Sequence, residues 1–177
     1  SNRKDTPRAL QAYHDKSIEQ LFESMGVLSP RELEARREIE FDGYVLKIQI
    51  ESRLMGDLVN NNIIPAVLEY QNKLIQNIQG MMSVFGEKEG KTMASTQIDI
   101  LKQVNLHLAA MKSASEKMLA ERKKANSMED VEKKALAYCD KVKVHFDEIR
   151  YHADKLELIV EDELWPLPKF RELLFIR

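Results

Sequence analysis

The stretch that comes nearest to a nucleotide-binding motif is "GEKEGKT", residues 86–92. A phosphate-binding loop needs four residues between its two glycines, so that successive backbone amides can surround the phosphates. Gly86 and Gly90 enclose only three residues, and the segment before them continues a helical pattern where the motif requires a strand. We therefore expect no cofactor-binding site here, and we interpret residues 86–95 as a polar, mobile loop.

The histidines are the residues best suited to bind a metal ion. A di-iron carboxylate site in a helical bundle needs Glu-x-x-His on two helices, and none of the four histidines follows a glutamate at that spacing. Glu148 and His152 lie one helical turn apart, but one such pair does not complete a site. We predict no metal ligands and, instead, a packed or hydrogen-bonded pair of histidines near a seam between helices. The four are His14, His107, His145 and His152.

Cys139 is the only cysteine and the only candidate for a thiol nucleophile. A nucleophile needs a base and an oxyanion hole, and the histidine nearest in sequence, His145, is six residues away on another part of the predicted helix. We therefore predict no catalytic residue and interpret Cys139 as a small core residue. A single cysteine also excludes an internal disulfide framework and suits a reducing, cytoplasmic location.

The composition is that of a helical globular protein. Of 177 residues, 32% are charged and 44% hydrophobic, with only 6 glycines and 5 prolines. The net charge of -2 gives no basic field for nucleic acid, and no apolar run approaches the roughly 18 residues that span a membrane. We therefore expect neither nucleic acid nor membrane as a partner. We interpret Ser1 and Asn2 as an expression scar and expect the natural chain to continue upstream.

A long helix is predicted from Pro30 onward, because Ser29 and Glu32 form a capping box at its start. Its apolar residues fall into two stripes, which predict that the helix is central and covered on more than one side. The first stripe contains Tyr44, Ile48, Met55 and Leu58, and the second contains Leu46, Ile50 and Leu54.

Pro65 interrupts this helix. Proline removes a backbone donor and clashes with the preceding turn, so a kink or break is expected near residues 61–64, with Asn61, Asn62 and Pro65 as the candidate hinge. The asparagines at 60–62 either satisfy backbone groups that the proline frees or form a contact site.

Two further stripes of apolar residues step in threes and fours on either side of a short turn at Asn126 and Ser127. They predict an antiparallel helical hairpin, and no segment alternates as a strand would. The fold expected for residues 1–177 is a single all-α domain, an elongated antiparallel bundle in which the Pro-kinked helix packs on the heptad-patterned hairpin. The stripes are Leu101, Val104, Leu108, Met111, Ser115, Met118, Arg122 and Ala125, and Val131, Ala135, Tyr138, Val142, His145, Ile149, His152, Leu156 and Ile159.

The C-terminal tail, residues 161–177, is expected to be extended because Pro166 and Pro168 bracket its centre. Its apolar side chains are the candidate interaction residues. The tail either folds back on its own bundle or docks on another domain or subunit, and the sequence leaves both open. These side chains are Trp165, Leu167, Phe170, Leu173, Leu174 and Phe175.

The chain resembles the C-terminal region of type III glutamine synthetases, the large bacterial enzymes that join ammonia to glutamate using ATP. The resemblance covers residues 6–175 and is weakest over 81–97. It is carried by "KSIEQLFESMGVLSPRELEAR", "YVLKIQIESRLMGDLVNNNIIPAVLEYQNKL", "ERKKAN", "AYCDKV" and "HFDEIRYHADKLELIVEDELWPLPKFRELLF".

The resemblance implies a parent ligase whose catalytic α/β domain, which holds ATP and divalent metals, lies upstream and is absent here. It implies that this fragment binds no cofactor. It also implies that the parent forms large double-ring homo-oligomers, in which the partners of this fragment are the upstream catalytic domain and neighbouring subunits. The function expected for the chain is that of a non-catalytic structural and assembly domain. The alternative is a regulatory or protein-interaction platform around Pro65 and residues 86–95.

Overall fold

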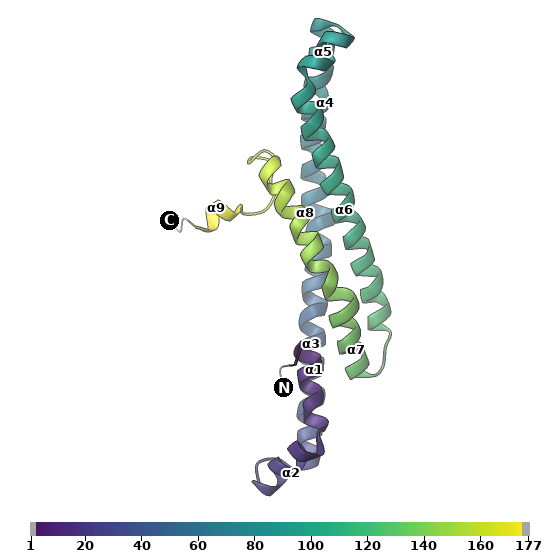
Figure 1. The fold of residues 1–177 in the computed structure, drawn as a ribbon, viewed down its shortest axis with the longest axis vertical. Helices are drawn as coiled ribbons and strands as arrows, with labels where there is room; N and C mark the ends of the chain where they lie inside the picture. Colours follow the sequence, from purple (N-terminus) through teal and green to yellow (C-terminus); the bar gives the residue numbers. More distant parts are fainter. Residues whose placement is uncertain (1–2, 175–177) are drawn as a thin grey trace. The chain divides into compact units, whose positions relative to one another are not determined.

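The computed structural model describes residues 3–174, apart from the side chain of Phe170. Over this range the chain forms helices and connecting turns without a strand, which confirms the all-α class (Figure 1). No helix among the described residues is long and apolar enough to cross a membrane. The chain divides into two compact units, which are described separately. Unit 1 contains the residues up to Leu54 and residues 117–145, and unit 2 contains residues 55–116 and those from 146 onward.

Unit 1 begins with short helices before the long helix. Asp5 caps the first of these, because its carboxylate accepts a hydrogen bond from the backbone N–H of Arg8 at 3.0 Å. The predicted capping box is confirmed, since Ser29 and Glu32 bond to each other at the start of the long helix. The elements are α1 (Thr6–Leu10), a 3₁₀ turn (Gln11–His14), α2 (Lys16–Ser24) and α3 (Pro30–Asp57).

The second half of unit 1 is the end of α6 (Ser95–Asn126), followed by a turn and α7 (Val131–Ala137). Beyond α7 the predicted second helix of the hairpin is not a regular α-helix, because it passes through a π-helical segment (Tyr138–Val142) and a 3₁₀ turn (Lys143–His145). The core lies between α3, the end of α6 and α7. Its buried members include Leu33, Phe41, Val45, Ile48, Met118, Ala125, Ala135, Tyr138 and Val142.

The prediction that both apolar stripes of the long helix are covered is wrong for the second stripe. Leu46, Ile50 and Leu54 are each more than half exposed. The core of unit 1 packs against one side of α3 only, and none of the described residues buries the other side.

Unit 2 is built around α4 (Ile64–Phe85) and the first part of α6, which run side by side (Figure 1). Gln71 donates to Asn105 at 2.9 Å and Gln97 to Asn77 at 3.1 Å, so amide side chains link the two helices. α8 (Phe146–Ile159) completes the unit's core, and α9 (Phe170–Leu173) lies in the tail. Buried residues include Val59, Ile63, Val67, Leu74, Val104, Met111, Ile149, Leu156 and Val160.

The segment predicted as a loop, residues 86–95, instead contains the helix α5 (Glu87–Met93). Gly86, at φ 81° and ψ 163°, supplies the sharp change of direction that ends α4, in a backbone region essentially restricted to glycine. α5 then packs back on α4 at Gly90, which is buried. Both glycines of the segment therefore have backbone roles that its polar composition did not reveal.

Pro65 disturbs the helix at the predicted place, but the backbone stays helical. α3 passes into a π-helical segment (Leu58–Ile63), in which the N–H of Ile64 donates to the carbonyl of Val59, and α4 then begins with Pro65 in its first turn. A proline inside a helix lacks one backbone donor and crowds the preceding turn, and the wider turn of the π-helical segment lies directly before Pro65.

Candidate functional site

Cys139 lies half-buried in unit 1 beside two carboxylates. Its thiol and the carboxylates of Asp5 and Asp140 offer ligand atoms within 4.8 Å of one another. The guanidinium of Arg8 already pairs with both carboxylates, so the positive charge that would balance them is supplied by the protein. Burial, and next the neighbouring Cys139, raise the pKa of Tyr44, which keeps its phenol neutral. Arg8 is therefore the charge partner of both carboxylates in this cluster.

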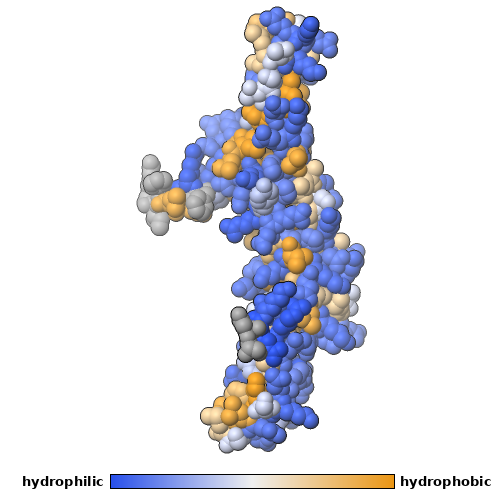
Figure 2. All heavy atoms as spheres, in the orientation of Figure 1, coloured by the Kyte–Doolittle hydropathy of each residue, from blue (hydrophilic) through white to orange (hydrophobic). Residues whose placement is uncertain are grey.

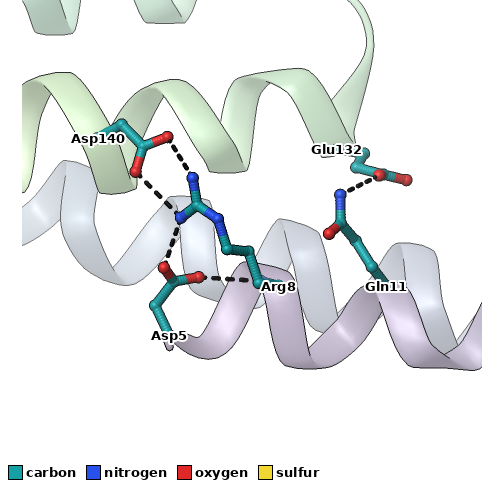
Figure 3. Close-up of polar contacts among 5 residues, drawn as sticks. All are labelled: Asp5, Arg8, Gln11, Glu132 and Asp140. Carbon is teal, nitrogen blue, oxygen red and sulfur yellow. Dashed lines mark hydrogen bonds and ion pairs between the residues drawn. The ribbon is translucent and has the colours of Figure 1, made fainter. Parts of the chain in front are cut away.

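Polar side chains fasten the N-terminal segment to α7 and to the π-helical segment that follows it, and we call this group the N-terminal anchor (Figure 3). Arg8 donates to both oxygens of Asp140, from Nη1 at 3.1 Å and from Nη2 at 2.8 Å. A bidentate guanidinium–carboxylate pair fixes orientation as well as distance. The anchor consists of Asp5, Arg8, Gln11, Glu132 and Asp140.

The charges of the anchor are mutually stabilised. The hydrogen bonds to Asp140, and next to Asp5, raise the pKa of Arg8 above its ordinary value. The same bond from Arg8 holds the pKa of the Asp140 carboxyl below its usual range. Both groups are exposed enough for salt to screen their charges. The pair therefore contributes little to the free energy of unfolding and serves mainly to fix the orientation of the N-terminal segment.

Glu132 is the second attachment point of the anchor and joins three elements. One carboxylate oxygen accepts from Gln11 at 2.9 Å, and the other accepts from Arg37 of α3 at 3.2 Å. Arg37 is buried, and its guanidinium lies 6.0 Å from the centre of the Phe41 ring. Sequence reasoning missed these contacts, because their partners are separated by 95 to 132 residues and no local pattern marks them.

In unit 2, the Nδ1 atoms of His107 and His152 lie 2.9 Å apart and join α6 to α8. This confirms the predicted hydrogen-bonded pair of histidines. A bond between two Nδ1 atoms needs one donor and one acceptor, so at least one ring must be neutral. Burial, and next the charge of His152 and that of Lys155, lower the pKa of His107.

The free energy of unfolding is therefore expected to fall as the pH drops from about 7.5 to about 5.5, because the unfolded chain takes up a proton that folded His107 resists. This stabilisation is complete above the ordinary histidine pKa of about 6.5 and is lost as the pH approaches the lower folded value. Urea denaturation at several pH values measures it. His107→Gln should reduce the pH dependence, whereas His14→Gln, an exposed histidine of unit 1, should retain it. A free energy that is flat or rises on acidification would contradict the prediction.

The apolar tail is partly buried and partly exposed. Trp165 is buried and Leu167 is half-buried, whereas Leu173 and Leu174 are each 65% exposed. Phe170 begins the short helix α9 and its side chain lies outside the described residues, as does the whole of Phe175.

Lys169 fastens the first part of the tail to the end of α8. Its buried ammonium donates to the carbonyls of Glu157 at 2.9 Å and Val160 at 3.0 Å, and to the Asp162 carboxylate at 2.6 Å. Lysine often caps the last carbonyls of a helix in this way. The hydrogen bond from Lys169, and next that from Arg171, lower the pKa of Asp162. The tail is thus fixed up to Lys169, and the exposed leucines follow that point.

Two candidate hinge residues, Asn61 and Asn62, lie in the π-helical segment of unit 2, and Pro65 follows in the first turn of α4. Asn61 is exposed and donates to the Asp57 carboxylate one turn earlier, Asn62 is half-buried, and Pro65 is exposed. Asn60 donates to the backbone carbonyl of Gly56 at 2.7 Å, nine residues before Pro65, so this bond does not involve a group that the proline frees.

Large apolar side chains are also exposed on α2, a helix with no buried residue of its own, and in the turn that follows it. Leu21, Met25 and Val27 are each more than half exposed. On the face drawn in Figure 2, hydrophobic residues gather over the α2 end of unit 1. An amphipathic helix whose apolar face stays uncovered is typical of a contact surface.

Comparison with known proteins gives a consistent result. The family described as the glutamine synthetase C-terminal domain matches residues 1–82. A glutamine synthetase of Bacteroides fragilis (strain YCH46) is 38% identical over 171 residues, which cover 97% of this chain and 24% of that protein. A type-3 glutamine synthetase of Dictyostelium discoideum is 31% identical over 177 residues, which cover 100% of this chain and 24% of that protein. The chain thus spans about a quarter of the length of these curated relatives.

Proposed function

We propose, from the premise that this chain belongs to the glutamine synthetase C-terminal domain family, that it is the non-catalytic structural and assembly domain of a type III glutamine synthetase. The proposed parent enzyme is a cytoplasmic ligase that joins ammonia to glutamate at the expense of ATP. In this proposal ATP and the divalent metals bind to the catalytic part of the parent. No residue described in this chain is assigned to them.

The observation that carries the proposal is the amount of large apolar surface left uncovered on a chain that spans only a quarter of its relatives. Exposed large apolar residues occur on α2 and in the turn after it, on α3 and at the end of the tail. Single exposed apolar residues are ordinary, but groups of them mark contact surfaces. The partners that we propose are the catalytic part of the parent and neighbouring subunits of its homo-oligomer.

The polar clusters support the same proposal. Arg8 is paired with the carboxylates beside Cys139, and the two histidines bond to each other at the seam between α6 and α8. Each cluster joins elements that are distant in sequence.

The test is removal of residues 3–177 from the full-length enzyme, followed by light-scattering mass and ligase activity. If the domain serves assembly, the truncated enzyme stays soluble and forms smaller particles. Full mass with altered activity would favour the alternative, a bracing or regulatory platform. Unchanged mass and unchanged activity would reject both. A shorter deletion, of residues 171–177, asks whether the exposed end of the tail alone accounts for the effect.

A further inference from the structure

An uncovered apolar stripe runs along α3 in unit 1, and we call it the α3 stripe. Its residues recur every three or four positions, so they lie on one face of the helix. The four large side chains are 67%, 57%, 57% and 56% exposed, in chain order. The α3 stripe consists of Ile39, Gly43, Leu46, Ile50 and Leu54.

The opposite face of α3 already supplies the core of unit 1, through Leu33, Phe41 and Ile48 among others. Apolar residues on two faces are the pattern of a helix that is covered on two sides. In the described residues only one side is covered. The pattern therefore indicates that another element of protein belongs on the α3 stripe.

Gly43 is a second, independent sign of a partner. Glycine is unfavourable in the interior of a helix relative to alanine. Nothing lies within 4 Å of the position that a Cβ at Gly43 would occupy, so the packing of this chain does not require a glycine there. In the middle of an apolar stripe, a missing side chain allows a second backbone to approach closely.

The borders of the α3 stripe carry exposed charges of both signs. Arg36, Glu40, Asp42, Lys47 and Arg53 lie next to it on the helix surface. An apolar centre with a mixed, polar rim is the composition of a protein–protein interface. A helix that lies on a membrane surface carries mainly lysine and arginine on its polar side.

The length of the relatives and the size of the surface indicate which protein segment covers the α3 stripe. About three quarters of the length of each of these curated relatives lies outside the part that this chain matches, since the chain covers 24% of each. A stable contact between separate molecules commonly uses about 20–30 residues a side. One helix face with four large side chains is much smaller, and such a surface suits a partner held nearby by a covalent tether. The N-terminal anchor holds the start of the chain on unit 1, the unit that also carries the α3 stripe.

We infer that the α3 stripe is the surface on which the preceding, catalytic part of the same polypeptide docks. This inference rests on the proposed function and names the surface and partner for it.

The experiment uses the full-length enzyme with one added thiol, Ile50→Cys, and peptide mass spectrometry measures the rate of maleimide labelling at that position separately from Cys139 and any other native thiol. The matched control is Leu106→Cys, because Leu106 is 62% exposed on α6 and its neighbours on the helix surface are polar or small. Each rate is divided by the rate in enzyme unfolded in urea. Docking predicts that the thiol at position 50 reacts on the order of tenfold more slowly than that at position 106. Equal rates would overturn the inference.

The occupant is identified by attaching a maleimide–benzophenone cross-linker to the thiol at position 50. A cross-linked product of one-chain mass, containing a peptide from before residue 1, is the expected result. A product of two-chain mass would identify another subunit as the occupant and would overturn the inference.

Gly43→Ala in the same enzyme provides a second variant that cannot be explained by loss of the fold, since alanine has room in unit 1. It should speed labelling at position 50 several-fold by holding the partner away, and leave position 106 unchanged. Unchanged labelling at position 50 would reject the close approach at Gly43. These readouts are separate from the deletion test. If position 50 is labelled rapidly but deletion of residues 3–177 changes mass or activity, only the docking surface is rejected. If that deletion changes neither mass nor activity, the proposed function is rejected.

Discussion

Gly90→Ala is expected to detach α5 from α4 and to lower the free energy of unfolding by about 1–3 kcal/mol, the usual cost of overpacking. An alanine Cβ at this position would lie 2.5 Å from the Cα of Met82 and 2.7 Å from the carbonyl oxygen of Met81. Both are backbone atoms of α4, which cannot rotate away as a side chain could. Urea denaturation of the purified chain, followed by circular dichroism, measures the change.

Gly80→Ala is the matched control for this prediction. Gly80 also lies in α4, but no atom is within 4 Å of the position of its added Cβ. Alanine is the better helix former, so this variant should gain about 0.5–1 kcal/mol. If both variants gain stability, then α5 does not depend on close approach at Gly90.

Glu132→Gln is expected to lower the free energy of unfolding by about 2 kcal/mol, the typical contribution of hydrogen bonds to a charged group. Both carboxylate oxygens of Glu132 accept hydrogen bonds, one from Gln11 and one from Arg37. An amide has only one accepting oxygen, so one of these donors loses its acceptor. If Arg37 loses it, a buried guanidinium is left without its closest negative partner, since the remaining carboxylate, of Glu34, is exposed and 4.0 Å away.

Two further variants test this explanation. Glu129→Gln removes an exposed carboxylate of the same turn and should change stability by less than about 0.5 kcal/mol. Arg37→Met combined with Glu132→Gln should cost less than the sum of the single changes, because the arginine no longer needs the carboxylate. Strictly additive losses would show that the two side chains act independently.

Much of the secondary structure follows from local chemistry and was predictable. Ser29 and Glu32 form their capping box, and Gly26, at a φ of 64°, follows α2 in the left-handed conformation with which glycine commonly ends a helix. The 3-4 spacing placed Met111 and Met118 in α6, and Tyr138 and Ile149 opposite them, among residues that are buried. These signals depend on neighbours within a turn or two, and the sequence contains that information directly.

Other features were missed because their cause is distant in sequence. The polar composition of residues 86–95 indicated a loop, but contact with α4 at Gly90 makes the segment a helix. Arg8 and Asp140 are 132 residues apart, so neither could be assigned as a partner of the other. Lys169 belongs to no motif that the sequence reveals, and only the folded chain brings it to the last carbonyls of α8.

The sequence by itself therefore determined the helical class, the apolar stripes of the two hairpin helices and the similarity to glutamine synthetases. It also predicted a pair of histidines in contact. Periodicity and local motifs can be recognised without knowledge of tertiary contacts. Only the tertiary structure decided which apolar residues are covered. Leu46 and Ile48 are equally apolar and two positions apart, yet a helix turns about 200° between them, so one faces water while the other is buried in the core of unit 1.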